Sequence, residues 1–188
     1  MLESADWVSC PERRAEHLLL EKMMNLARSA PMDSESINED VRDIVIIGYT
    51  IVGCLNGIGQ SSVQVEAREV IVPDQQTANY YVRFEFSSGG DYPQTSTATV
   101  AYSDVDRLII MLKKLEATAI STDRFSLSEV QYEVGDLKII VFNTDRGSTM
   151  AAINVNGMSA HLNSASKLQS FTSLIEGAKR HIEKNKMF

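Results

Sequence analysis

The hydrophobic pattern of this chain changes twice from the period of a strand to the period of a helix. Apolar residues first alternate with polar ones, which is the period of a β-strand with one buried face. They then recur every three to four residues, which is typical of a helix that buries one stripe. This order occupies residues 43–120 and again residues 121–188. The sequence therefore predicts an α+β fold with two similar units, each of four antiparallel strands followed by a helix.

In the first unit the clearest alternation is at residues 80–86, whose shared face is formed by Tyr80, Val82, Phe84 and Phe86. Residues 44–52, 63–68 and 95–102 supply the other predicted strands. A helix follows, and Ser103 is its predicted N-cap. Its apolar stripe is formed by Val105, Leu108, Ile109, Leu112 and Leu115.

The second unit contains the strongest turn signal in the chain, Asn156-Gly157. Both central positions of a type I′ hairpin turn require positive φ, which Asn and Gly tolerate best. We predict strands at residues 127–134, 137–142, 149–155 and 158–162. Asn163 or Ser164 is the predicted cap of a closing helix, whose apolar face is formed by Leu168, Phe171, Leu174, Ile175, Ala178 and Ile182.

A further helix is predicted before the two units, at residues 11–30, with an acidic linker at residues 31–42. Leu19, Met23 and Met24 belong to its broad apolar face, which must be covered by the rest of the chain or by a second copy. The expected organisation is therefore residues 1–42, 43–120 and 121–188, within one compact domain that forms a homodimer.

The net charge of the chain disfavours two classes of partner. The net charge is −7, which disfavours the basic surface with which most nucleic-acid-binding proteins neutralise phosphates, and also disfavours an anionic membrane surface. No secretory signal pattern is visible at the start, and no apolar run is long enough to span a bilayer. If residue 1 is the native start, we expect a cytoplasmic protein.

The stretch GCLNGIGQSS at residues 53–62 is similar in outline to a phosphate-binding loop, but Gln60 stands where that motif requires a lysine. Its glycines are therefore expected to bend the chain between two strands, with positive φ at Gly57 and Gly59. The three histidines are scattered and the two cysteines lack metal-site spacing, so no metal or cofactor is expected. A hydrolase triad could in principle be drawn from Ser159, His161 and Asp145, which leaves an enzyme as a third reading.

The helix and mixed-sheet order, the acidic charge and the apolar first helix together resemble small acidic chaperones that hold a client segment and pair as dimers. We therefore predict a non-catalytic protein-binding or peptide-binding module. Exposed strand edges and the apolar helix are the features that would accept a partner. The predicted binding residues are Leu19, Met23, Met24, Tyr80, Tyr81 and Arg83.

The repeated order of four strands and a helix, spanning residues 43–185, also resembles the topology of the Whirly and PUR-type folds. This resemblance implies single-stranded nucleic-acid binding on a sheet surface that carries aromatic and basic residues. Its candidate stacking and cationic residues are Tyr80, Tyr81, Arg83, Tyr132 and Phe142. The acidic charge disfavours this alternative, which stands second to protein binding.

Overall fold

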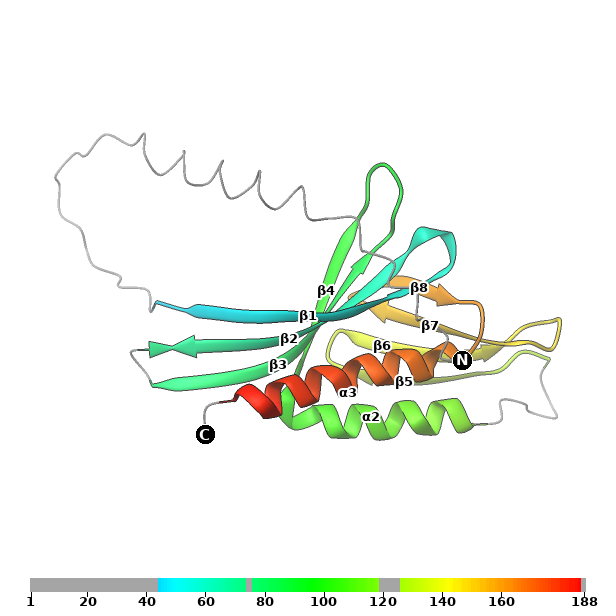
Figure 1. The fold of residues 1–188 in the computed structure, drawn as a ribbon. Coiled ribbons are helices and arrows are strands. Elements are labelled where there is room, and N and C mark those ends of the chain that lie inside the picture. The colour runs from blue at the N-terminus through cyan, green and yellow to red at the C-terminus, as the bar shows by residue number, and fades with distance from the viewer. Residues whose placement is uncertain (1–43, 74–75, 119–125, 187–188) are drawn as a thin grey trace, which may run out of the picture. The chain divides into compact units, whose positions relative to one another are not determined.

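The computed structural model describes residues 44–73, 76–118 and 126–186 (Figure 1). It contains two four-stranded antiparallel sheets and two α-helices, which confirms the predicted α+β class. The predicted N-terminal helix and linker, and with them Leu19, Met23 and Met24, lie outside the described residues.

The first sheet has its strands in chain order, so that β1 and β4 form its edges. A short 3₁₀ segment, η1, connects β1 to β2. The elements are β1 (Ile46–Asn56), η1 (Ile58–Gln60), β2 (Ser62–Val72), β3 (Thr77–Ser87) and β4 (Thr95–Ala101).

The second sheet repeats this order with shorter strands, and each sheet is followed by one helix. Its strands are β5 (Glu129–Val134), β6 (Leu137–Asn143), β7 (Thr149–Val155) and β8 (Met158–Leu162), and the helices are α2 (Tyr102–Ala117) and α3 (Lys167–Asn185). Neither of these two helices is long and apolar enough to cross a membrane.

One hydrophobic core joins the two units. Helix α3 follows the second sheet in the chain, yet it packs on β1, β2 and β3 of the first sheet and against α2 (Figure 1). The rings of Phe84 on β3 and Phe171 on α3 lie 5.6 Å apart at a tilted angle, and both side chains are fully buried. The first sheet is therefore covered by the helix of the second unit.

The helical stripe predicted for α2 is confirmed, since its five residues are the buried ones of that helix. The cap prediction is wrong, because Ser103 lies inside the first turn and Ala101 occupies the N-cap without a side-chain hydrogen bond. Helix α3 likewise has Ser166 at its N-cap rather than Asn163 or Ser164. Both helices are positioned by burial of their apolar stripes, which outweighs the contribution of a capping side chain.

The glycine-rich loop between β1 and β2 corrects one prediction. Gly59 has a positive φ of 71°, as expected, but Gly57 has a φ of −96° that any residue can adopt. Gly57 is needed for a different reason, because a Cβ there would lie 2.9 Å from the backbone oxygen of His161 on β8. The loop packs against the second sheet, and the turn at Asn156-Gly157 has the predicted positive φ at both positions.

Strand β1 changes direction at a bulge, where the register with β2 shifts between Ile51 and Gly53. Helix α3 crosses close to this point. A Cβ on Gly177 would lie 2.9 Å from Val52 Cγ1, and a Cβ on Gly53 would lie 2.6 Å from Leu174 Cδ2. Small residues on both elements thus allow the close crossing of α3 over β1.

We predict that Gly57→Ala lowers the free energy of unfolding by about 1–3 kcal/mol, because the added methyl group cannot move away from a backbone oxygen. Gly48→Ala is the matched control, since its Cβ would meet Glu69 at an ordinary 3.6 Å. Urea unfolding followed by circular dichroism measures both changes. Equal effects of the two substitutions would contradict the close packing of this loop on β8.

Candidate binding surface

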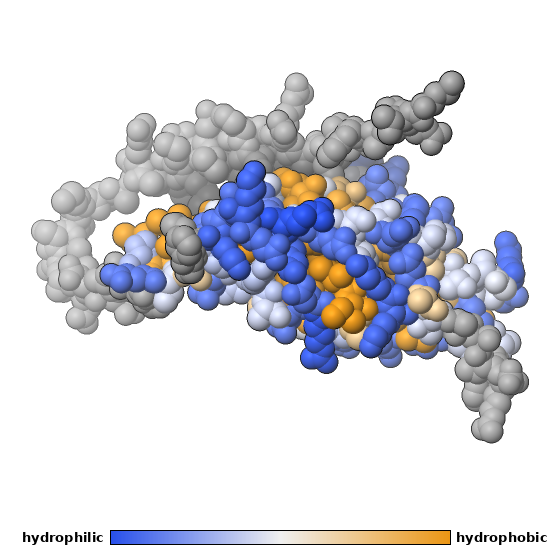
Figure 2. Space-filling model, turned by 60° about the horizontal axis from the view of Figure 1, so that its bottom comes forward, coloured by the Kyte–Doolittle hydropathy of each residue, from blue (hydrophilic) through white to orange (hydrophobic). Residues whose placement is uncertain are grey.

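The beginning of β1 is an exposed, apolar sheet edge. In the described part of the chain β1 is hydrogen-bonded to β2 alone. Six large apolar side chains, two just before β1 and four within it, are between 49% and 70% exposed: Ile44, Val45, Ile46, Ile47, Tyr49 and Ile51. Figure 2 shows hydrophobic surface at this end of the sheet, where β1 begins and β2 ends. Such an edge presents unpaired backbone groups beside apolar side chains.

Two features leave this edge uncovered. Helix α3 ends at Asn185, near Gly48 and Thr50, so that the strand residues before Gly48 extend past it (Figure 1). The bulge after Ile51 separates this part of β1 from the part that packs under α3. Residues 44–51, here called the free edge, are therefore exposed on both faces of the sheet.

The outer face of the first sheet, which points away from the core, carries a cluster of paired charges. Glu66 on β2 is only 3% exposed, and its carboxylate accepts hydrogen bonds from Arg68 and Arg83, each at 3.0 Å. Arg83 also contacts Glu85 at 2.7 Å. The guanidinium of Arg68 lies 5.6 Å from the centroid of the Tyr49 ring on β1. Two arginines and two glutamates thus form a neutral cluster beside the free edge.

The predicted binding residues on β3 do not share one surface. Successive strand residues point to opposite faces, so Tyr80 packs against the core while Tyr81 and Arg83 lie on the outer face. Arg83 is engaged by Glu66 and Glu85, which offsets the charge that a phosphate would need. Of the two predicted aromatics on this strand, only Tyr81 is placed to contact a ligand on the outer face. This arrangement counts against the nucleic-acid alternative.

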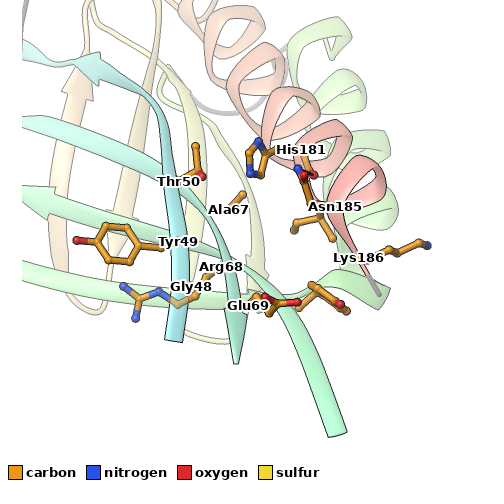
Figure 3. A pocket seen from close by; sticks show the side chains of 11 residues that line it. Gly48, Tyr49, Thr50, Ala67, Arg68, Glu69, His181, Asn185 and Lys186 are labelled. Carbon is orange, nitrogen blue, oxygen red and sulfur yellow. Dashed lines mark hydrogen bonds between the residues drawn. The ribbon is translucent and has the colours of Figure 1, made fainter. Parts of the chain in front are cut away.

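A shallow pocket of about 190 Å³ lies between the inner face of the first sheet and the end of α3. Figure 3 shows His181 and Asn185 of the helix facing Thr50 and Ala67, with Tyr49 and Arg68 on the other side of β1. Glu69 and Tyr80 complete the polar lining. The volume is below the roughly 300 Å³ at which small-molecule sites begin, so the pocket is better suited to a side chain than to a substrate.

Side chains on α2 and α3 form an ionic network on the helical side of the molecule. Tyr102 donates a hydrogen bond to Glu183 at 3.0 Å, and Lys179 contacts Asp106 at 2.7 Å and Glu183 at 3.3 Å. Donation from Tyr102 and Lys179 lowers the pKa of Glu183, while hydrogen bonds to Asp106 and Glu183 raise the pKa of Lys179. Desolvation, followed by the bond to Glu183, raises the pKa of Tyr102. The contacts between α2 and α3 account for these three pKa shifts.

Two of the three residues of the hypothetical hydrolase triad, Ser159 and His161, have structural partners. Ser159 accepts a hydrogen bond from Asn154 Nδ2 at 2.9 Å, and the His161 ring packs edge-on against Phe142 at 6.5 Å. Asp145 lies in the loop between β6 and β7. Within residues 44–73, 76–118 and 126–186, no group of three His, Cys, Asp or Glu side chains is placed to hold a metal ion.

Comparison with known proteins finds no matching family model, no matching curated protein and no matching solved structure. The free edge and the neutral cluster of Glu66, Arg68, Arg83 and Glu85 are therefore interpreted from their own geometry.

Sequence reasoning missed the free edge, although a signal for it was present. The run of apolar residues at 44–52 indicates a strand buried on both faces. As the first strand of a meander, however, it lies at a sheet edge, where that burial requires a partner outside the sheet. Order along the chain and hydrophobicity together would have identified it.

We predict that Glu66→Ala lowers the free energy of unfolding by about 2 kcal/mol, because it leaves two half-buried guanidinium groups without their shared carboxylate. Glu85→Ala is the control, since that side chain is 27% exposed and forms an ion pair with Arg83, and it should cost less than about 1 kcal/mol. Chemical denaturation measures both. Equal losses would show that the buried position of Glu66 contributes nothing.

We also predict that Tyr102→Phe raises the pKa of Glu183, because the phenol is the principal donor that holds it below its ordinary 4.5. Because the pKa of Glu183 is lower in the folded state than its ordinary value, the ionised carboxylate stabilises the fold at a pH above that ordinary value. This stabilisation is lost as the pH falls through the folded-state pKa. A ¹³C-carboxyl NMR titration measures the change. Tyr92→Phe, in an exposed loop, is the control and should leave the Glu183 titration unchanged.

Proposed function

We propose that the protein is a non-catalytic protein-binding or peptide-binding module, and that it holds an extended segment of its partner along the free edge. The observation that carries this proposal is the exposure, on both faces of the sheet, of residues 44–51, which are the beginning of β1 and the two residues before it. A strand added at such an edge gains main-chain hydrogen bonds, while side chains on alternate faces provide selectivity.

The outer face of the edge supports an apolar partner segment. Residues directly opposite each other in a sheet share a face, so Ile47, Tyr49 and Ile51 lie beside Val70, Arg68 and Glu66 respectively. Because Arg68 and Glu66 are paired with each other, the partner meets three apolar side chains without an unbalanced charge.

The inner face adds a second contact surface. Ile46 is 52% exposed there, beyond the end of α3. The shallow pocket lies next to it, lined by Gly48, Thr50 and Tyr80. A partner strand on β1 would place every second side chain on this inner side, where the pocket can accept one of them.

A peptide selection tests this function. Peptides of about ten residues selected from a displayed random library should be rich in β-branched and aromatic residues. Their amide NMR shifts should map to residues 45–51. Ile47→Lys or Ile51→Lys should weaken their binding at least tenfold, which is about 1.4 kcal/mol.

Ile110→Lys is the matched control, because Ile110 is 55% exposed but lies on α2. It should leave peptide affinity unchanged. Selected peptides whose shifts map to α2 and α3, or whose binding survives both lysine substitutions in β1, would refute the proposal.

A further inference from the structure

The free edge lacks the features with which natural proteins protect a strand from pairing. Charged residues, prolines and short length are the usual protective devices. Residues 44–55 contain no charged residue and no proline, and β1 is 11 residues long. Its bulge lies after Ile51, beyond the exposed part. The free edge therefore lacks these barriers to pairing with another strand.

We infer that the partner of the free edge is a second copy of this chain, paired antiparallel about a two-fold axis at Gly48. This inference rests on the proposed function and names the partner at the same site. A two-fold axis perpendicular to the sheet keeps the outer faces of both copies on one side. The two first sheets would become one continuous eight-stranded sheet.

The register follows from overlap and side-chain chemistry. An axis at Gly48 places Ile47 opposite Tyr49 of the second copy, and Val45 opposite Ile51. Both outer-face pairs are of the aromatic–β-branched or aliphatic kind that stabilises antiparallel strands. Gly48 would face its own counterpart on the inner side of the sheet. This register pairs residues 45–51 of one copy with residues 45–51 of the other.

Charge and area also fit a second copy. Like surfaces meet at a two-fold axis, so any unbalanced charge would repel itself there. The free edge is uncharged, and the neighbouring Arg68 is balanced by Glu66 at 3.0 Å. Its six exposed large apolar side chains give each copy apolar area to bury against the other.

Sedimentation velocity of the full chain tests the inference. The wild-type protein should form dimers at micromolar concentration, and Ile47→Lys or Ile51→Lys should weaken the dimer at least tenfold. Ile110→Lys should leave it unchanged. Circular dichroism confirms that each variant is folded. A wild-type protein that stays monomeric to about 100 µM, or dimers that survive both lysine substitutions, would overturn it.

Disulfide trapping tests the geometry separately. In a background that carries Cys10→Ser and Cys54→Ser, the single substitutions Ile46→Cys, Gly48→Cys and Thr50→Cys are compared. In the proposed dimer the two Cα atoms of residue 48 face each other about 5 Å apart, which is within disulfide range. The two copies of residue 46, or of residue 50, lie about 13 Å apart along the strand. Trapping should therefore peak at position 48. Equal trapping at the three positions, or none, would overturn antiparallel pairing at Gly48.

The two proposals fail separately. If the chain is monomeric while selected peptides map to residues 45–51, the edge binds other proteins and self-pairing is wrong. If neither dimers nor β1-directed peptides are found, the protein-binding function fails with it.

Discussion

The fold depends on the packing of α3 across the first sheet. Phe171 meets Phe84 at the centre of this contact, and Gly53 and Gly177 allow the helix to lie close to the bulge in β1. Contacts of Lys179 with Asp106 and of Lys113 with Glu176 join α3 to α2. Because the last helix covers the first sheet, neither four-stranded unit completes its own core, and the two repeats form one structure.

The same packing determines which part of the first sheet stays exposed. Helix α3 covers the inner face of the first sheet as far as Gly48 and Thr50 and then ends, so that no described residue covers the beginning of β1. The charges of the outer face are paired around Glu66, which removes the net charge that would attract phosphates. The surface that remains is apolar, uncharged and extended, which matches a protein strand better than a nucleic acid.

Local patterns in the sequence predicted the elements well, because each strand and helix buries one regularly spaced set of side chains. The stripe of α2 and the turn at Asn156-Gly157 are examples. Contacts between residues distant in the chain could not be predicted from local patterns. Which sheet α3 covers, the approach of Gly57 to β8 and the pairing of Glu66 with Arg83 all depend on residues distant in the chain. The division into residues 1–42, 43–120 and 121–188 stays a prediction.

The position of α3 also has a consequence for synthesis on the ribosome. The first sheet is complete at Ala101, but the helix that covers it ends at Asn185. At typical translation speeds of about 5–20 residues per second, several seconds separate the two events. During that interval the nascent chain exposes both the apolar inner face of the sheet and its unprotected edge. We expect the nascent chain to bind a holding chaperone until α3 has emerged.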